Sequence, residues 1–410
     1  MRLPLPEIGA PWPDLKLRMR DYATGDVRWR EGKTAVYVFN AGPEVEQVQK
    51  EAYALFMSEN GLGPMAFPSL RRMESEVIDF GLSLLHAPEG AAGTITSGGT
   101  DSITMAVKAA RDFARKARGV RGPLNIVLPR SAHPAFDKAA AMMEIEVRRT
   151  PLANLLADPQ AMDATADAAT VMIVGSAPCF PYGLIDPIAA LSDLAIARDL
   201  WLHVDACVGG YLAPFVKMNG GDVAMFDFEA PGVRSISADL HKYGYCAKGA
   251  STVFFRSEAL QAFMGFDLND WPGGRMVTPT LAGTRPGGAI SAAWAVMNFL
   301  GVQGYRAKQA LVTRTRERIE AGVTALGFTV IGAPQLGIVA FSHPRVNALA
   351  LWPGMRARGW FTGMTSEPAG LHLMLSPFHA EVVETYLTDL ASALADAGGA
   401  APAQPAARYS

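Results

Sequence analysis

Hydrophobic positions before residue 90 recur with the spacing of amphipathic helices. In the segment 43–60 they fall on one side of a predicted helix, at Val45, Val48, Ala52, Leu55 and Phe56. The sequence Gly-Leu-Gly-Pro at 61–64 ends this helix, and a second helix is predicted over 73–85. Residues 1–60 are therefore expected to form an arm followed by one helix.

Beyond residue 90 the pattern changes to short β-rich apolar runs that alternate with helical stretches. Buried strands are predicted at 125–129, 170–175, 200–205 and 251–256, with helices between them, such as 101–117 and 186–199. This alternation favours an α/β fold with a parallel sheet covered by helices. Such sheets bind ligands beyond the carboxyl ends of their strands.

After residue 290 the pattern becomes mainly helical and then mixes short strands with helices, which predicts a smaller lobe. Helices are expected over 290–300 and 305–325. The predicted organisation is an arm and helix, a large domain, a small C-terminal α+β domain and a low-complexity, disordered tail, at 1–60, 61–290, 291–395 and 396–410.

Composition narrows the class of protein. The 410 residues are 50% hydrophobic and 19% charged, with a formal net charge of −2, so no nucleic acid or membrane-surface partner is expected. No apolar run is long enough to span a bilayer, and the N-terminus lacks the apolar core of a signal peptide. The three cysteines form no CxxC pair, so we expect neither a metal nor a disulfide, and a cytoplasmic location.

The segment T-S-G-G-T-D-S at 96–102 opens a helical pattern. Glycines permit close approach of a ligand, hydroxyl groups can donate hydrogen bonds, and a helix N-terminus favours an anion. A phosphate site is one interpretation, and an ordinary helix cap with a glycine turn is the other.

Three further side chains have both a structural and a chemical interpretation. Asp205 ends an apolar strand, where it either caps the next element or meets a cation such as a protonated ring nitrogen. His133 follows a strand and is either a loop residue or an imidazole stacked on an aromatic cofactor. Lys242 lies beside His241 and near Lys248, and is either a surface lysine or an amine nucleophile.

The order of these features is more informative than any one of them. A phosphate turn, a histidine, a strand-end aspartate and a lysine follow one another, separated by strands. Pyridoxal 5'-phosphate needs four such groups: a phosphate cradle, a stacking ring, an acid at the pyridine nitrogen and a lysine for the aldehyde. The sequence therefore predicts a pyridoxal phosphate site.

Longer segments resemble the sphingosine-1-phosphate lyase family, within the group II pyridoxal-dependent decarboxylases. They are T-S-G-G-T-D-S-I at 96–103, H-V-D-A-C-V-G-G at 203–210, S-I-S-A-D-L-H-K-Y-G-Y-C-A-K-G at 235–249 and T-P-T-L-A-G-T-R-P-G-G at 278–288. The similarity runs from residue 34 to 387. It implies the aspartate-aminotransferase fold of fold type I enzymes and a homodimer whose active sites use both chains.

The resemblance also implies how the cofactor is held. Lys242 is the Schiff-base lysine, Asp205 pairs with the pyridine nitrogen and His133 stacks on the ring. The remaining positions lie around the phosphate or line the site: His241, Gly99, Thr100, Cys207 and, from the neighbouring subunit, Thr284.

For the substrate, the resemblance implies contacts from Tyr37, in T-A-V-Y, and from Lys248, the second lysine of the family motif. One departure concerns the family segment N-P-L-H-P-D-x-F-P, which reads N-G-L-G-P-M-A-F-P at 60–68. Gly63 replaces a histidine that helps to bind the substrate phosphate, and Met65 replaces an acid.

The leading hypothesis is a carbon–carbon lyase that cleaves a phosphorylated long-chain amino alcohol to an aldehyde and phosphoethanolamine. Lys242, His133 and Tyr37 are the groups considered for its proton transfers. An amino acid decarboxylase is the alternative, which Gly63 and Met65 favour because they remove polar groups from the substrate pocket. A third possibility is a pseudoenzyme that binds a partner, and the intact Lys242, Asp205 and His133 argue against it.

Overall fold

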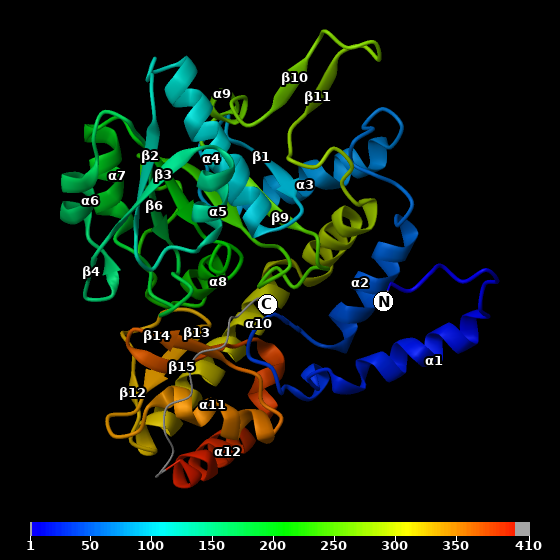
Figure 1. Ribbon diagram of the computed structural model, residues 1–410, viewed down its shortest axis with the longest axis vertical. Coiled ribbons are helices and arrows are strands. Elements are labelled where there is room, and N and C mark those ends of the chain that lie inside the picture. The colour runs from blue at the N-terminus through cyan, green and yellow to red at the C-terminus, as the bar shows by residue number, and fades with distance from the viewer. Residues whose placement is uncertain (1, 398–410) are drawn as a thin grey trace.

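Seven strands form the central sheet, in the order β1-β9-β8-β7-β6-β2-β3 (Figure 1). The structure, a computed structural model, describes residues 2–397. Strands β2, β3, β6, β7 and β8 run parallel, whereas β9 is antiparallel to both neighbours. The strand bounds are β1 Ala92–Thr96, β2 Leu124–Pro129, β3 Ile145–Thr150, β6 Thr170–Ser176, β7 Trp201–Asp205, β8 Val233–Ala238 and β9 Ser251–Phe255.

The four predicted strands are confirmed within one residue at each end, as β2, β6, β7 and β9. The prediction did not include β1, β3 and β8. Their sequences, AGTIT, IEVRRT and VRSISA, mix polar with apolar residues and so lack a continuous apolar run. The sheet that they complete is nevertheless the mostly parallel one that the alternation predicted.

Side chains of the central strands alternate between two apolar layers, as the pleat of a strand requires. Ile126 and Leu128 belong to the apolar cluster that includes α4 and α5, whereas Val127 belongs to the cluster that includes α7 and α8. Helices therefore cover both faces of the sheet. Their bounds are α4 Gly99–Lys116, α5 Ala135–Met142, α7 Ile188–Ala197 and α8 Ala213–Met218, with the short helices α6 Pro159–Thr165 and α9 Glu258–Gln261 beside them.

Helices α2 (Pro43–Leu55) and α3 (Pro68–Leu84) correspond to the two helices predicted before residue 90. The second begins five residues earlier than predicted, because Pro68 occupies its first turn, where a missing N–H costs nothing. The two helices predicted after residue 290 form one long helix, α10 (Gly287–Ala325), which is interrupted at Gly301 with φ 54° and ψ −177°.

A second sheet lies in the C-terminal lobe, with four antiparallel strands in the order β12-β13-β15-β14. A separate apolar cluster joins it to helices α11 and α12.

The predicted boundary at 290/291 falls within α10, and the division into domains stays a prediction. The predicted disordered tail lies, beyond residue 397, outside the described residues. The bounds are β12 Thr329–Val330, β13 Ile338–Ser342, α11 Ala348–Ala357, β14 Gly363–Ser366, β15 Ala369–Met374 and α12 Val383–Asp396.

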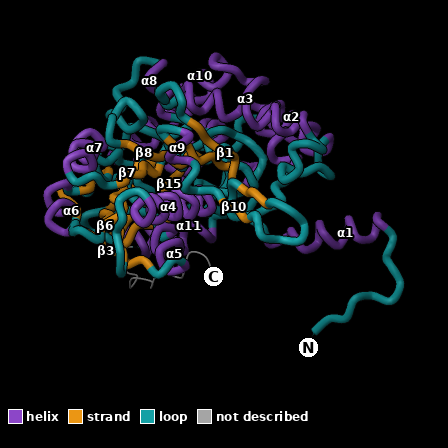
Figure 2. The backbone as a smooth tube through the Cα atoms, turned by 90° about the horizontal axis from the view of Figure 1, so that it is seen from above, coloured by secondary structure: helices purple, strands orange, loops and turns teal. Residues whose placement is uncertain are grey.

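Two segments project from the rest of the chain (Figures 1 and 2). One is a helix that the sequence did not predict, α1 (Trp12–Tyr22), none of whose residues is buried. The other is the hairpin β10 (Phe266–Leu268) and β11 (Met276–Thr278). Both leave large apolar side chains exposed, including Trp12, Leu15, Phe266 and Trp271. A further small hairpin joins β4 (Leu152–Ala153) to β5 (Leu156–Ala157).

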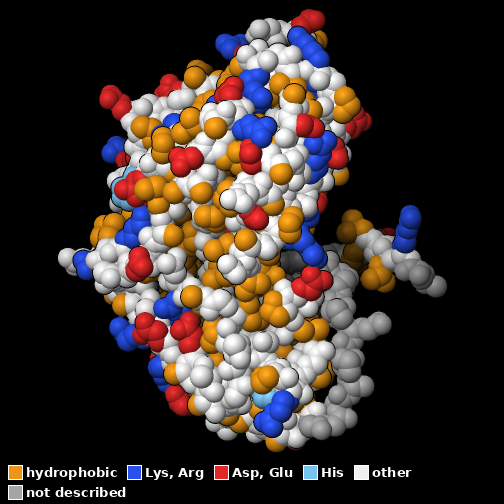
Figure 3. Space-filling model, turned by 90° about the vertical axis from the view of Figure 1, so that its left-hand side faces the viewer, with side chains coloured by type: hydrophobic (Ala, Val, Ile, Leu, Met, Phe, Trp, Pro, Cys, Tyr) orange, Lys and Arg blue, Asp and Glu red, His pale blue; other side chains and the backbone are white. Residues whose placement is uncertain are grey.

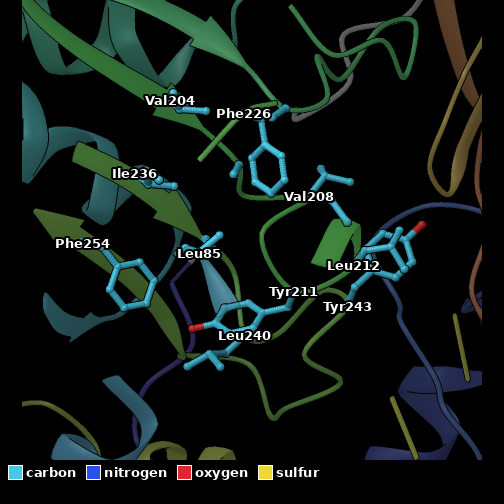
Figure 4. Close-up of a cluster of buried hydrophobic side chains, with 14 of the residues drawn as sticks. Leu85, Val204, Val208, Tyr211, Leu212, Phe226, Ile236, Leu240, Tyr243 and Phe254 are labelled. Carbon is cyan, nitrogen blue, oxygen red and sulfur yellow. The ribbon is translucent and has the colours of Figure 1, made fainter. Parts of the chain in front are cut away.

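Buried apolar side chains hold the carboxyl ends of β7 and β8 in place. Val204 and Ile236 belong to the cluster drawn in Figure 4, together with Leu240 and Tyr243 from the turn after β8. The Tyr243 hydroxyl donates to the Leu375 carbonyl at 2.6 Å, which ties this turn to the C-terminal lobe. The turn that carries Lys242 is thus held on a rigid support.

Within residues 2–397, the structure contains no helix that combines the length and the apolar character needed to cross a bilayer. On the face seen in Figure 3, acidic and basic side chains are interspersed. That face offers no broad cationic patch of the kind that binds nucleic acid.

Candidate active site

A cavity of about 330 Å³ lies at the carboxyl ends of the parallel strands. The strands end at Ser176, Asp205 and Ala238, and the turn after β8 brings in Lys242. This is the position expected for ligands of a parallel α/β sheet. Nine sequence-predicted residues line the cavity together: Tyr37, Gly99, Thr100, His133, Asp205, Cys207, His241, Lys242 and Lys248.

Asp205 lies at the floor of the cavity, directly at the end of β7, and is buried. Its Oδ1 accepts hydrogen bonds from the backbone N–H of Cys207 at 3.1 Å and from the Ser237 hydroxyl at 3.4 Å. The Cys207 thiol donates to the same hydroxyl at 3.3 Å, and burial raises the pKa of this thiol well above its usual value. Cys207 is thus a neutral packing residue that helps to fix the aspartate.

His133 reaches the cavity from the turn after β2. Its Nδ1 accepts a hydrogen bond from the backbone N–H of Ala135 at 3.2 Å. Burial lowers the pKa of His133, and the negative charge of Asp205 opposes this shift only in part. The ring is therefore neutral near pH 7, and its proton is assigned to Nε2, because Nδ1 is already an acceptor.

Lys242 and His241 share a carboxylate that the sequence prediction missed. Asp239 Oδ2 lies 3.0 Å from Lys242 Nζ and 3.7 Å from His241 Nε2. His241 Nδ1 donates to the Ala250 carbonyl at 2.8 Å, so its Nε2 faces the cavity. The available signal was an acid at the end of an apolar run, three residues before the lysine.

Lys248 lies in a different setting at the mouth of the cavity. Its Nζ donates to the carbonyls of Tyr37 at 2.8 Å and His241 at 3.3 Å, and no carboxylate among the described residues forms an ion pair with it. Burial, followed by repulsion from Lys242, lowers the pKa of Lys248 to about 8. This amine is cationic at neutral pH and is free to attract an anion.

Gly99 begins α4 at the wall of the cavity. A Cβ at this position would lie 2.9 Å from Cys207 Sγ and 2.9 Å from Asp239 Oδ2, so only glycine leaves the first turn open. The backbone N–H groups of that turn make a favourable position for a phosphate. The helix N-terminus, the buried lysine, the strand-end carboxylate and the neutral imidazole together fit pyridoxal phosphate.

Ser176 is a second residue that the sequence prediction missed. It ends β6 and lines the cavity, and its buried hydroxyl has no hydrogen-bond partner among the described residues. It offers a polar group to a bound ligand. A serine at the end of a strand carries little signal on its own, because such residues also cap helices.

Thr284 is exposed and does not line this cavity within one chain. Its neighbour Arg285 is buried in an ion pair with Glu74, and the adjacent Pro286 forms a bridge with Asn60. Thr284 therefore lies beside the segment 60–68. In that segment Gly63 faces open space, since a Cβ there would meet only Ala66, at 3.7 Å, and Met65 is 97% exposed.

Residues 4–343 match the family model of the pyridoxal-dependent decarboxylase conserved domain. A sphingosine-1-phosphate lyase of Oryza sativa is 38% identical over 375 residues, which cover 89% of this chain and 69% of the relative. A probable L-tyrosine/L-aspartate decarboxylase of Methanothermobacter thermautotrophicus is 33% identical over 83% of this chain and 92% of the relative. The solved sphingosine-1-phosphate lyase of Burkholderia pseudomallei superposes with a TM-score of 0.93 at 36% identity, covering 97% and 94% of the two chains.

Proposed function

The chain belongs to the sphingosine-1-phosphate lyase family, within the pyridoxal-dependent decarboxylases, and from this premise we propose that it cleaves a phosphorylated long-chain amino alcohol between C2 and C3. It is a pyridoxal-phosphate-dependent lyase. The products are a long-chain aldehyde and phosphoethanolamine. The observation that carries the proposal is the pair of lysines in one cavity, because Lys242 is paired with a carboxylate whereas Lys248 donates its hydrogen bonds to carbonyl groups.

The cofactor's phosphate fits at the first turn of α4, with Gly99, Thr100 and His241 around it. Lys242 would hold the aldehyde carbon, and the negative charge of Asp205 would favour a protonated ring nitrogen. Pyridoxal phosphate, when bound, would supply an electron sink for the electron pair of a breaking bond. His133, as a neutral ring, would pack on the cofactor without adding a second positive charge.

The proton transfers of this cleavage involve two atoms of the substrate. A base takes the proton of the C3 hydroxyl, the C2–C3 bond breaks, C3 becomes the aldehyde carbon, and C2 then receives a proton. In His133, Nδ1 already accepts from Ala135 and Nε2 carries the ring proton. It cannot take up another proton without losing that hydrogen bond, so Tyr37 is the better placed base, and Lys242, released as an ammonium, is the better placed donor to C2.

Product analysis tests the function directly. Sphingosine-1-phosphate and a panel of amino acids are supplied to the purified protein, and aldehyde, phosphoethanolamine and carbon dioxide are measured. We expect aldehyde and phosphoethanolamine in equal amounts from the phosphorylated lipid. Carbon dioxide from an amino acid, with no aldehyde from the lipid, would establish the decarboxylase alternative instead.

Substitution of Lys248 is predicted to affect the substrate more than the cofactor. Lys248→Ala should lower kcat/KM for the phosphorylated substrate by about 10- to 100-fold, the usual loss for a hydrogen bond to a charged group. Its effect on cofactor binding should be small. Titration of the cofactor by its visible absorbance separates the two effects, and an equal loss of both would contradict this role.

The pKa of Lys248 also predicts how KM for the phosphorylated substrate depends on pH. Since the pKa of Lys248 is about 8, its positive charge is present below pH 8 and is lost above it. A substrate phosphate is already close to fully ionised there, with a second pKa of about 6. KM for the phosphorylated substrate should therefore rise as the pH passes 8. Lys248→Arg, which keeps its charge, should remove that rise.

We propose further that the protein works in the cytoplasm as a homodimer with shared sites. Thr284 and the segment 60–68 lie together but away from the Lys242 cavity, and a second copy is the natural source of both groups. The exposed apolar side chains of α1 provide a surface for that copy. The three cysteines are free and buried, in keeping with a reducing compartment.

A further inference from the structure

Asp239 lies next to the amine of Lys242 because the chain turns sharply after β8. The Asp239 carbonyl accepts from the Lys242 backbone N–H at 3.2 Å, and the Lys242 carbonyl accepts from the Tyr245 N–H at 3.0 Å. The Asp239 N–H in turn donates to the Cys207 carbonyl at 3.3 Å. The backbone thus returns the lysine side chain to the carboxylate three residues before it.

The carboxylate is almost completely buried at the wall of the cavity. Its side chain is 2% exposed, Oδ2 is 3.0 Å from Lys242 Nζ, and Oδ1 has no hydrogen-bond partner among the described residues. Gly99 packs so closely that a Cβ there would lie 2.9 Å from Oδ2. A buried carboxylate with so few donors stays ionised only beside a cation, and Lys242 is the nearest one.

Asp239 and Asp205 therefore differ in the cationic group that each can pair with. Asp205 is bonded to Cys207 and Ser237 at the strand end, where a ring nitrogen is expected. Asp239 lies on the lysine side of the cavity, near the first turn of α4. Neither carboxylate can replace the other, because Asp205 is fixed at the end of β7 and Asp239 in the turn after β8.

We propose that Asp239 is a positioning residue that receives the Lys242 ammonium whenever this lysine is not covalently bound to the cofactor. The inference rests on the proposed function for the role of Lys242 as the cofactor lysine. The ion pair keeps the released amine within reach, protonated and turned toward the floor of the cavity. The amine then stays close to the cofactor during the part of the cycle in which the substrate occupies its place.

The charges around Lys242 give this arrangement a measurable consequence. Burial lowers the pKa of Lys242, but Asp239, Cys207 and Asp205, of which Asp239 contributes most, together raise it overall. Burial alone would raise the pKa of Asp239, but the positive charges of Lys242 and His241 lower it by more, so that the pKa falls overall. The other ionisable groups that face this pair are His133, His241, Lys248, Asp205 and Cys207. In the cofactor-free protein, Lys242 should therefore be an unreactive ammonium near neutral pH.

The test uses the full chain stripped of cofactor. Its amines are labelled with acetic anhydride over a series of pH values, and the modification of Lys242 is followed by mass spectrometry. In the wild type, the midpoint should lie above the ordinary lysine pKa of about 10.4. In Asp239→Asn it should fall well below the wild-type midpoint, since the amine then loses its nearest carboxylate and only the smaller contribution of Asp205 still opposes burial. Asp101→Asn is the matched control, because Asp101 is a buried carboxylate of α4 bonded to Ser97 instead.

A second measurement separates positioning from a general loss of structure. Added pyridoxal phosphate should bind covalently to Asp239→Asn faster than to the wild type at neutral pH, by about tenfold for each unit by which the lysine pKa falls. A damaged site would react more slowly. A wild-type midpoint at or below the ordinary value would overturn the proposal even if the variant fails to fold. The labelling needs no substrate, so a failure of the proposed function would leave this result unchanged.

Discussion

Lys242→Ala should abolish turnover. The variant loses the amine that is proposed to hold the cofactor, and Lys248, the other lysine that lines the cavity among the described residues, is held at its mouth by the carbonyls of Tyr37 and His241. We expect kcat to fall by roughly 10⁴-fold or more, as for other covalent catalytic groups. Borohydride should fix the cofactor irreversibly to the wild type but not to the variant.

The same variant tests whether the active sites are shared. Thr284→Asp should also be inactive, because it brings a negative charge against the cofactor phosphate of the neighbouring subunit. When the two inactive chains are mixed after unfolding and refolded together, half of the dimers contain one chain of each kind. Those dimers have one intact site, so about one quarter of the wild-type activity should return. No recovery would contradict shared sites, and a monomer in sedimentation would contradict the dimer.

Asp205→Asn is predicted to have the second largest effect. The amide can still accept from Cys207 and Ser237 through its carbonyl oxygen, so the fold around β7 should be kept. It cannot stabilise a proton on the ring nitrogen, and the cofactor becomes a weaker electron sink. We expect kcat to fall by about 10²- to 10³-fold, the usual loss for one electrostatic group at a transition state.

The measurement compares kcat with cofactor content. The variant should still bind pyridoxal phosphate, as judged by its visible absorbance, while turning over slowly. Ser237→Ala is a suitable control, because it removes the longer hydrogen bond to Asp205, at 3.4 Å, and those to Cys207 and His203, but leaves the carboxylate charge in place. A kcat for Asp205→Asn close to that of Ser237→Ala would contradict the role given to the carboxylate charge.

Much of the large lobe was predictable because its strands are buried on both faces. Continuous apolar runs identified β2, β6, β7 and β9 to within a residue. The direction of β9 was not predictable, because an antiparallel strand buried in a sheet has the same apolar run as a parallel one. The helix α1 was missed because none of its side chains is buried within the chain.

For the site, nine of the ten residues singled out from the sequence lie in one cavity, and Thr284 does not. Asp239 was missed, although it lies only three residues before the predicted lysine. The pattern marked Lys242 through its neighbours His241 and Lys248, whereas the partner of its charge depends on how the turn after β8 folds back.

The sequence by itself determined the alternation of strands and helices, the residue types expected at the cofactor site and the family resemblance, because these follow from local periodicity and short motifs. The tertiary structure decided which neighbours surround each charged side chain of the site. It brought Lys248 to the carbonyl of Tyr37, 211 residues away, and Asp239 against the first turn of α4. Such contacts depend on how the chain crosses the sheet, and the free energy of a buried charge depends on those neighbours. The different surroundings of Lys242 and Lys248, a carboxylate for one and carbonyl groups for the other, are therefore a property of the folded chain.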